Sequence, residues 1–471
     1  MQARRQMNGY NVNKSEHHSR NLYHKLQHNL LPAQCLQKNS QGLNMTGDNS
    51  KDTQIRAIAA AVVGNAMEWY DFVVFGFFAT VLSQLFFPQG DDQAALLLTL
   101  ATFGVGFCSR PIGGLFFGFY ADRSGRKAAL QSVIFLMTLA VAIIAFAPVY
   151  ASIGLAAPIL IVIGRLLQGF ATGGEFSSST SFLIEASPAG QRGFYGSLQM
   201  AGQAVSILFG TLVGIAVTTN FSTEQLQTWA WRLPFMAGLL IGPVGFYIRR
   251  HLNETSVFES AEHEKGTREL LTDLLRKYPA KLLAAFGTTI SATIYFYVIL
   301  IYMPTYGKTE LGLTLSQSFE AQAFGLILLV MLTPAAGYLS DQIGRRPLLW
   351  ISNGLFLALS YPLFRYLTES HSQTSLTLVQ ATFCVSLSGV FGVLSTVLAE
   401  QFPTKVRSTG LALPYNLAVM IFGGFAPMIV TWLIGYLDTP VAPAYYLIFG
   451  ALSGIASALI LTDGYKSVRL D

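Results

Sequence analysis

The chain has 471 residues, of which 52% are hydrophobic and only 12% are charged. Soluble domains carry about 25% charged residues, so this composition and the mean hydropathy of +0.45 exclude an ordinary soluble globular protein. The net charge of +5 does not indicate a nucleic-acid partner, because the basic residues stand in short loops between apolar segments. Cys35, Cys108 and Cys384 lie far apart and predict neither a disulfide framework nor a metal site.

The chain begins with a polar stretch, residues 1–54, which is rich in Asn, Gln, His and Ser and predicts a disordered cytoplasmic tail without a cleavable signal peptide. Apolar segments follow, each long enough at about 1.5 Å per residue to cross a hydrocarbon core of about 30 Å. They predict twelve spanning helices, at 56–82, 94–118, 128–148, 156–184, 193–218, 231–249, 282–306, 317–339, 347–368, 375–399, 408–434 and 441–462. The charged loop 250–281 predicts a cytoplasmic linker between two halves, 55–249 and 282–462. Residues 463–471 are expected to form a short cytoplasmic C-terminus.

The distribution of Lys and Arg predicts the orientation of these helices. Basic residues are retained on the cytoplasmic side of a membrane. They concentrate in the tail and in every second loop, while the other side of the predicted membrane holds Arg232, Lys308 and Arg365. Both termini are therefore expected in the cytoplasm.

Two motifs occur twice at nearly the same offset and indicate an internal duplication. GFYADRSGRK at 118–127 matches GYLSDQIGRR at 337–346, and the spacing ExxPxxxR begins at both Glu185 and Glu400. Two similar bundles suit alternating access around a central site. The acid of the first motif can pair with arginines and with the start of a neighbouring helix, which predicts a cytoplasmic gate. A role as basic topology anchors is the alternative. The gate candidates are Gly118, Asp122, Arg123, Gly125, Arg126, Glu185, Arg192, Gly337, Asp341, Gly344, Arg345, Arg346, Glu400 and Arg407.

Ionisable residues inside the apolar segments are candidates for proton coupling, because a charge at membrane depth requires a partner or a cavity. Glu68 and Asp71 are three residues apart and share one helical face with Asn65. Two carboxyl groups on one helical face in an apolar segment cannot both ionise without a large free-energy cost, so one of them is expected to carry a proton. Arg165 can neutralise the other, and Glu175 is the fourth candidate. A static ion-pair network that holds the helices together is the alternative.

The candidate anion receptor is Arg110, because a guanidinium can hold a carboxylate through two parallel hydrogen bonds. Its position near the cytoplasmic end of the second segment equally suits a role in the gate. Other polar residues recur along the segments and predict a polar path, although each can instead be a contact between helices. These further candidates for substrate binding are Asn65, Tyr70, Gln199, Gln203, Tyr295, Tyr302 and Asn416.

The motifs resemble those of the major facilitator superfamily and, within it, of the metabolite:H+ symporters. The resemblance rests on GNAMEWYDF, RPIGGLFFGFYADRSGRK, GRLLQGFATGGEF, QRGFYGSLQ, YMPTYGKT, GYLSDQIGRRP and EQFPTKVRSTG. It implies an all-α fold of two six-helix bundles in a bacterial inner membrane, and proton-coupled uptake of a small metabolite such as citrate, a dicarboxylate, proline or betaine. YMPTYGKTELGL and the ending GYKSVRLD are most similar to citrate symporters, so an organic acid is expected, with a proline/betaine carrier as the alternative. The expected partners are a small molecule, protons and lipid, and a monomer is expected.

Two other classes of protein fit the residues less well. A proton-antiport drug exporter is expected to carry a Gly-Pro pattern in the fifth segment, which here contains GSLQMAGQAVSILFG. An enzyme is not expected, because the segments contain no His cluster, phosphate loop or nucleophile elbow. No cofactor and no metal are predicted. A receptor without transport stays open, although the membrane acids would then lack a purpose.

Overall fold

The computed structural model describes residues 47–87, 90–124, 126–188, 190–239, 272 and 274–462. The first 46 residues of the predicted tail, most of the predicted linker and residues 463–471 lie outside this part, as do the side chains of 47–57, 59–61, 118–119, 121–130 and 405. The chain divides into two units, Met1–Arg56 and Ala57–Asp471. Only the helical residues 47–56 of the first unit are described, and everything below concerns the second.

The first half of this unit consists of helices that follow the predicted segments closely. Its first span is bent by 63° at Phe78, and its second and fourth spans are interrupted at Ser109 and at Gly173–Gly174. The described elements are α3 (Gly47–Phe77), α4 (Ala79–Phe86), α5 (Asp92–Cys108), α6 (Arg110–Ser124), α7 (Arg126–Phe146), α8 (Tyr150–Ile153), α9 (Ala156–Thr172), α10 (Glu175–Ala186), α11 (Arg192–Asn220), α12 (Thr223–Gln225), η2 (Leu226–Ala230) and a helical stretch at 232–239.

The second half repeats this pattern of long helices. Two of these helices begin with capping boxes, at Thr314 and at Ser372. In a capping box the side chain of the first residue accepts a hydrogen bond from the backbone N–H three residues later, and the side chain of that later residue accepts one from the backbone N–H of the first. Two helices contain a π-helical stretch, a feature that is frequent at functional sites. The elements are α15 (Pro279–Tyr295), η4 (Phe296–Tyr302), α16 (Met303–Thr309), α17 (Leu315–Ile343), α18 (Arg345–Ser370), α19 (Gln373–Glu400), η5 (Thr404–Val406), α20 (Arg407–Ala418), η6 (Val419–Gly424), α21 (Ala426–Leu437) and α22 (Pro443–Ile460).

Within the described residues, nine helices are long and apolar enough to cross a membrane, and the bent pair α3 and α4 makes ten. Gln131–Phe146 is a shorter apolar helix. The sixth predicted segment, 231–249, is described only as far as residue 239. No strand occurs in the described part. This helical content agrees with the predicted all-α membrane fold.

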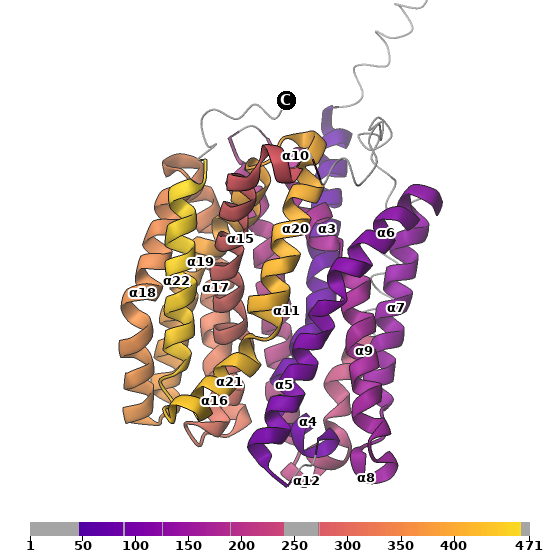
Figure 1. Ribbon diagram of the computed structural model, residues 1–471, viewed down its shortest axis with the longest axis vertical. Coiled ribbons are helices and arrows are strands. Elements are labelled where there is room, and N and C mark those ends of the chain that lie inside the picture. Colours follow the sequence, from indigo (N-terminus) through magenta and orange to yellow (C-terminus); the bar gives the residue numbers. More distant parts are fainter. Residues whose placement is uncertain are drawn as a thin grey trace, which may run out of the picture. The chain divides into compact units, whose positions relative to one another are not determined.

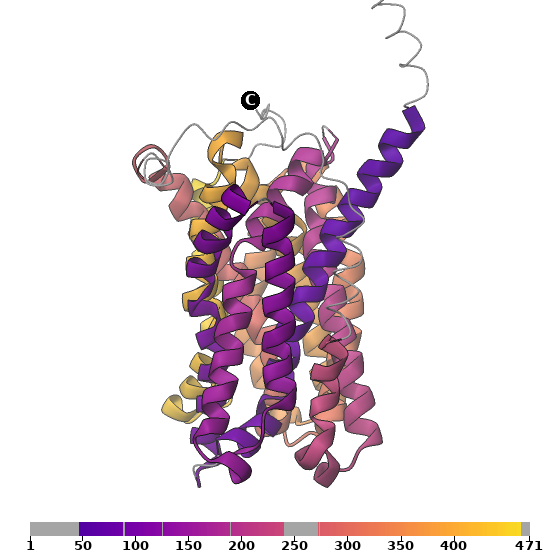
Figure 2. The same ribbon diagram turned by 90° about the vertical axis from the view of Figure 1, so that its right-hand side faces the viewer.

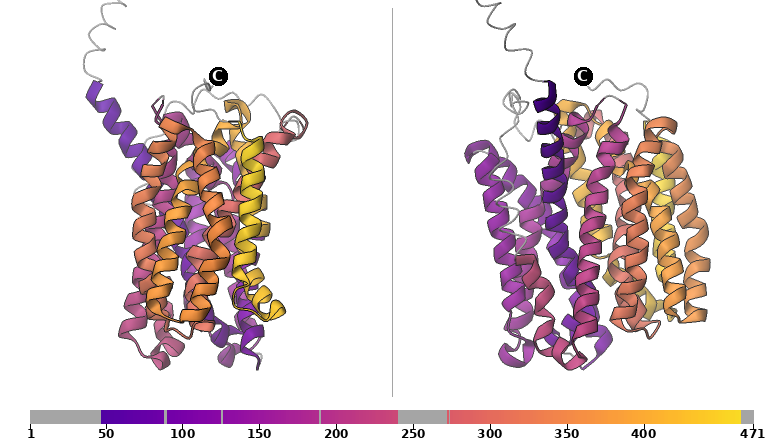
Figure 3. Two further views of the ribbon diagram at one scale, coloured as in Figure 1. Left: turned by 90° about the vertical axis from the view of Figure 1, so that its left-hand side faces the viewer. Right: turned by 180° about the vertical axis from the view of Figure 1, so that it is seen from behind.

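The helices of the two halves form two neighbouring groups, with α11 and α17 at their boundary (Figure 1). The view in Figure 2 looks onto the first half, with α5, α6, α7 and α9 in front. The left panel of Figure 3 looks onto the second half, with α18, α19 and α22 in front. The region between the groups is therefore lined by α11 and α17 on one side and by α5, η6 and α21 on the other.

Polar and apolar side chains are distributed as in a protein that lipid surrounds. Large apolar residues such as Phe135, Met331 and Leu459 are exposed on the outside of the helices. Charged and amide side chains such as Arg165 and Gln199 are buried completely. Because lipid solvates apolar groups well and charges poorly, this arrangement places the ionisable groups of the predicted site inside the protein.

Candidate functional site

Three ionisable side chains are buried at the centre of the first half, and they come from three different helices. Arg165 of α9 is 0% exposed, Arg110 at the start of α6 is 5% exposed, and Asp71 of α3 is 7% exposed. Glu68, one turn before Asp71, and Glu175, in the first turn of α10, are half-buried. The guanidinium groups of Arg110 and Arg165 lie over the same ring, that of Phe72, and Asp71 is near enough to Arg165 to feel its charge.

Arg165 is held by partners within its own half. One terminal nitrogen donates to Gln168 Oε1 at 2.8 Å, and the other donates to the carbonyl oxygen of Phe103 at 3.2 Å. Its guanidinium also lies over the rings of Phe72 and Phe75, at 4.6 and 4.8 Å from their centroids. These contacts fix the guanidinium in the helix packing, because each of its two terminal nitrogens already has an acceptor.

Arg110 has a different environment. Its guanidinium lies over the rings of Phe107, Phe72 and Trp69, at 4.5, 4.8 and 5.4 Å from the centroids. No residue of the described part accepts a hydrogen bond from it, and its Nε is completely enclosed. Aromatic faces stabilise a cation, but they do not satisfy its N–H groups. Arg110 is therefore a buried cation with unused hydrogen-bond donors.

The carboxylate of Asp71 packs against the backbone of the helical stretch 232–239, at Gly238. A Cβ atom at Gly238 would overlap its carboxylate, so only glycine permits this approach. The Oδ1 atom of Asp71 has no hydrogen-bond partner among the described residues. No ion pair joins Asp71 to Arg165 within that part of the chain, although the charge of Arg165 acts on Asp71 at longer range. The role of Asp71 in proton coupling stays a prediction.

Several predicted polar residues of the first half form contacts between its helices. Asn65 Oδ1 accepts a hydrogen bond from Gln203 Nε2 at 3.0 Å, which joins α3 to α11. Gln199 accepts from Thr180 at 2.7 Å. The hydroxyl of Tyr70 donates to the carbonyl oxygen of Pro234 at 2.9 Å. These side chains already have partners within the first half, so their role in substrate binding stays a prediction.

The predicted polar residues of the second half also have partners. Tyr295 donates to Asn353 Oδ1 at 2.8 Å, and Tyr302 accepts from Thr431 at 3.0 Å. Asn416 reaches the other half, because its Nδ2 donates to the carbonyl oxygen of Gly173 at 3.1 Å. Tyr295 and Tyr302 therefore join helices within one half, and Asn416 joins the two halves at the break between α9 and α10.

Sequence reasoning missed two tyrosines that lie near Arg110. Tyr297 of η4 packs its ring against Phe107 at 5.4 Å, and Tyr415 of α20 stacks on Phe176 at 3.6 Å. Both come from the second half and contact rings of the first. The sequence gives no signal that separates Tyr297 from Tyr295, because both stand in one apolar run and the π-helical stretch changes the helical phase.

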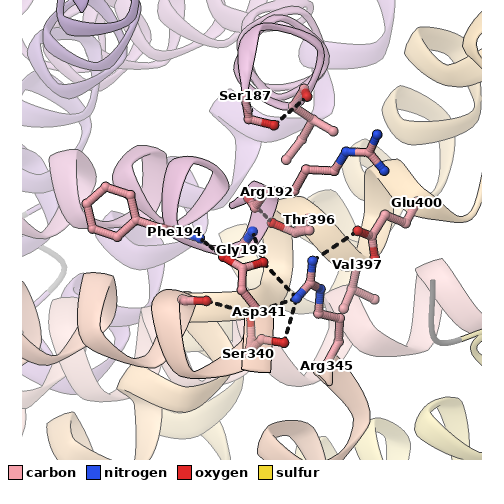
Figure 4. Close-up of polar contacts among 12 residues, drawn as sticks. Ser187, Arg192, Gly193, Phe194, Ser340, Asp341, Arg345, Thr396, Val397 and Glu400 are labelled. Atoms are coloured by element: carbon pink, nitrogen blue, oxygen red, sulfur yellow. Dashed lines mark hydrogen bonds and ion pairs between the residues drawn. The ribbon is translucent and has the colours of Figure 1, made fainter. Parts of the chain in front are cut away.

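At one end of the bundle, the predicted gate residues of the second half form a network, which we call the motif end (Figure 4). Asp341 at the end of α17 accepts hydrogen bonds from the backbone N–H groups of Gly193 and Phe194, at 2.8 and 3.0 Å. These groups lie in the first turn of α11, where a carboxylate stabilises both the free donors and the helix dipole. Asp341 also pairs with Arg345 at 2.9 Å, and Arg345 pairs with Glu400 at 3.2 Å.

A further ion pair joins the two halves at the motif end. Arg407 of α20 pairs with Glu185 of α10 at 2.6 Å. Thr396 of α19 donates to the carbonyl oxygen of Arg192 at 3.0 Å. Gly337 allows α17 to approach α11 closely, since a Cβ there would meet the carbonyl oxygen of Gly193 at 2.6 Å.

The other gate candidates are less fully described. Gly344 lies between α17 and α18 with φ +99°, a conformation that favours glycine. Arg346 donates to the carbonyl oxygen of Leu461 after α22. Gly125 lies outside the described residues, and so do the side-chain positions of Gly118, Asp122, Arg123 and Arg126.

The halves also touch at the opposite end of the bundle. The hydroxyl groups of Thr219 and Ser316 are hydrogen-bonded at 2.9 Å, which joins α11 to α17. Lys308 of α16 donates to Thr80 of α4 at 3.4 Å. Arg110 and Asp71 therefore lie in a structure whose two halves are in contact at both ends.

Comparisons with known proteins agree with this architecture. A family model described as "Sugar (and other) transporter" matches residues 57–281 and 259–462. A solved structure of a D-xylose-proton symporter superposes with a TM-score of 0.67 over 88% of this chain and 98% of that chain, at 20% identity. At that identity the likeness concerns the fold alone, and it confirms the predicted fold of two helical halves.

Two groups of relatives are similar in sequence over most of the chain. The citrate-proton symporter of Salmonella typhi is 37% identical over 407 residues, which are 86% of this chain and 93% of that protein. The proline/betaine transporter of Escherichia coli (strain K12) is 34% identical over 418 residues, which are 87% of this chain and 83% of that protein.

Proposed function

We propose that this chain, which belongs to the Sugar (and other) transporter family of the major facilitator superfamily, imports a small organic acid together with protons by alternating access. The predicted resemblance to metabolite:H+ symporters is confirmed by the two groups of relatives. The same relatives confirm that the chain is a multi-pass membrane transporter and not an enzyme. The identity of the substrate and the residues that bind it are our proposal.

The observation that carries the proposal is the environment of Arg110. A buried guanidinium without an acceptor is unfavourable unless an anion arrives to satisfy it. Arg165 also carries a positive charge, and the two guanidinium groups repel each other. An organic acid supplies both the missing acceptor and the missing negative charge, which favours a carboxylate substrate at Arg110.

Asp71 is our candidate for the proton carrier. Its carboxyl group is buried, lacks a partner for Oδ1 among the described residues and feels the charge of Arg165. A buried carboxyl group binds a proton more readily than an exposed one. Protonation of Asp71 changes the net charge next to the two arginines, and so it links proton binding to the occupancy of the anion site. Glu68 and Glu175 remain further candidates at the margin of this region.

We also propose that the motif end faces the cytoplasm. The predicted cytoplasmic loops contain most of the Lys and Arg residues, and the repeated motifs stand in two of these loops. Both termini then lie in the cytoplasm of a bacterium, and the protein resides in its inner membrane. We also propose that it acts as a monomer.

A zwitterionic substrate of the proline/betaine type is the second candidate. The rings of Trp69, Phe72 and Phe107 could surround a quaternary ammonium group, since cations bind to aromatic faces. In the structure, however, Arg110 itself occupies these faces. This occupation favours the organic acid.

The experiment is uptake of labelled citrate, 2-oxoglutarate, proline and betaine into proteoliposomes under an imposed inward proton gradient. The proposal predicts accumulation of an organic acid that collapses when a protonophore dissipates the gradient. Accumulation of betaine or proline alone would support the second candidate. Expulsion of a hydrophobic dye without uptake of any of the four compounds would contradict both candidates.

A further inference from the structure

Tyr297 has a buried hydroxyl group that the packing of the protein does not use. The side chain is 2% exposed, and its hydroxyl has no hydrogen-bond partner among the described residues. Buried polar groups almost always have partners, and an unpaired one costs about 1–3 kcal/mol. Tyr295, two residues earlier, shows the usual case, because its hydroxyl is bonded to Asn353.

Tyr297 lies next to Arg110, although the two residues belong to different halves. Its ring is 5.4 Å from that of Phe107, and the guanidinium of Arg110 lies 4.5 Å from the same Phe107 ring. Tyr415 precedes Asn416, whose Nδ2 donates to the carbonyl oxygen of Gly173 at 3.1 Å, and a Cβ at Gly173 would overlap the carbonyl oxygen of Arg110. One cation from the first half and two phenols from the second half therefore converge.

Tyr415 resembles Tyr297 in its surroundings. It is 6% exposed, its ring stacks on Phe176 of the first half, and none of the described residues forms a hydrogen bond with its hydroxyl. Thr293 adds another buried hydroxyl without a partner in the described part. A Cβ at Gly423 would overlap both Thr293 and the ring of Tyr297, so these two side chains pack closely against the backbone of η6.

The chemistry of these groups selects one class of ligand. A guanidinium can only donate hydrogen bonds, and a phenol donates when it faces an anion. A carboxylate accepts about four hydrogen bonds through its two oxygen atoms. We propose that Arg110, Tyr297 and Tyr415 bind a single carboxylate of the transported substrate, so that this carboxylate joins the two halves. This inference rests on the proposed function and extends its site to the second half.

The consequence is a link between occupancy and the approach of the halves. An empty site leaves the donors of Arg110 and both phenols unsatisfied, while a bound carboxylate satisfies donors from both halves at once. A substrate without a carboxylate would satisfy neither set. The affinity for the substrate should therefore depend on a hydroxyl group of the second half as well as on the guanidinium of the first.

The test compares Tyr297→Phe with Tyr306→Phe in the full-length purified protein. Both variants lose one buried hydroxyl from the same span, and the hydroxyl of Tyr306 donates to the carbonyl oxygen of Pro440 at 2.8 Å. One readout is the concentration of citrate, 2-oxoglutarate, proline or betaine that gives half of the maximal rise in melting temperature, and the other is KM for uptake. Tyr297→Phe should raise these values about tenfold or more for each bound compound, because a hydrogen bond to a charged group is lost. Tyr306→Phe should leave them unchanged and lower only the melting temperature without ligand.

A double-mutant cycle identifies the shared carboxylate. If Arg110 and Tyr297 bind the same group, Tyr297→Phe should weaken binding much less in an Arg110→Lys background than in the wild type. Fully additive effects, or equal effects of Tyr297→Phe and Tyr306→Phe on ligand binding, would overturn the inference and leave the proposed function intact. If none of the four carboxylates stabilises or enters with the wild-type protein, the proposed function fails as well.

Discussion

Arg110 and Arg165 have the same side chain and nearly the same burial, yet their surroundings give them different roles. Both terminal nitrogens of Arg165 donate to groups of its own half, which makes it a structural cation and a source of positive potential for Asp71. The guanidinium of Arg110 lies over aromatic rings instead, and none of the described residues accepts a hydrogen bond from it. Its unused donors are the reason why we propose that Arg110 receives the ligand.

The replacement Arg110→Gln tests this difference at the residue scale. Removing one partner of a buried, hydrogen-bonded charge pair costs about 2–5 kcal/mol, which corresponds to at least a roughly 30-fold rise in KM for citrate uptake. The matched control is Arg365→Gln, which removes the same charge from an exposed ion pair with Glu369. An unchanged KM in Arg110→Gln, or an equal change in the control, would exclude Arg110 as the anion receptor.

The sequence singles out the charged residues of the proposed site and does not single out Tyr297 or Tyr415. Asp71, Arg110 and Arg165 stand out because an ionisable residue in an apolar segment needs a special reason. Tyr295 and Tyr297 carry the same chemical signal, and only the direction of each side chain separates them. That direction depends on the local π-helical phase and on the packing of the opposite half, neither of which is encoded in one short segment.

At the scale of helices, the contact between α17 and the start of α11 is the main connection of the motif end. The carboxylate of Asp341 satisfies two N–H groups in the first turn of α11 and pairs with Arg345. The sequence analysis proposed this kind of contact for Asp122, and Asp341 is its counterpart in the second copy of the motif. The contact connects the halves and must break when the motif end opens.

Asp341→Asn should favour opening of the motif end. The amide of Asn keeps one oxygen acceptor and loses the ion pair with Arg345. Its NH2 group faces a backbone N–H, which is left without an acceptor and destabilises the closed motif end by about 1–3 kcal/mol. The measurement is the rate at which a thiol reagent labels a cysteine at buried Ser197, beside Gly337, after Cys35 and Cys108 have been replaced by serine. Labelling should accelerate about fivefold or more.

The control for this variant is Glu369→Gln, which breaks an exposed ion pair worth at most about 1 kcal/mol. It should leave the labelling of the cysteine at 197 unchanged. Equal labelling rates in Asp341→Asn and the unmodified background would mean that the Asp341 contact does not hold the motif end closed.

The positions of the helices were predictable because hydropathy and helical rise determine where a span can begin and end. The predicted segment 317–339 corresponds to α17 (Leu315–Ile343), and 375–399 corresponds to α19 (Gln373–Glu400). The 63° bend at Phe78 and the π-helical stretches η4 and η6 were not predicted. Hydropathy indicates where a span lies, but it does not indicate where a helix bends or changes its hydrogen-bonding pattern.

At the scale of the whole molecule, the two halves are in contact on both sides of the buried charges. The motif end is connected through Asp341 and the pair of Arg407 with Glu185, and the opposite end through Thr219 and Ser316. Alternating access requires that these two sets of contacts break in turn around a fixed site. Arg110 and Asp71 lie between them, so their charge state can influence which set breaks.

We propose that a proton on Asp71 is carried together with the substrate. Two activities of Asp71→Asn are measured in proteoliposomes: accumulation of labelled citrate driven by a proton gradient, and exchange of labelled for unlabelled citrate without a gradient. The exposed Asp438→Asn serves as the matched control. Asp71→Asn should lose accumulation and retain exchange, because an amide cannot carry the proton. Full gradient-driven accumulation by Asp71→Asn would show that Asp71 does not carry the proton.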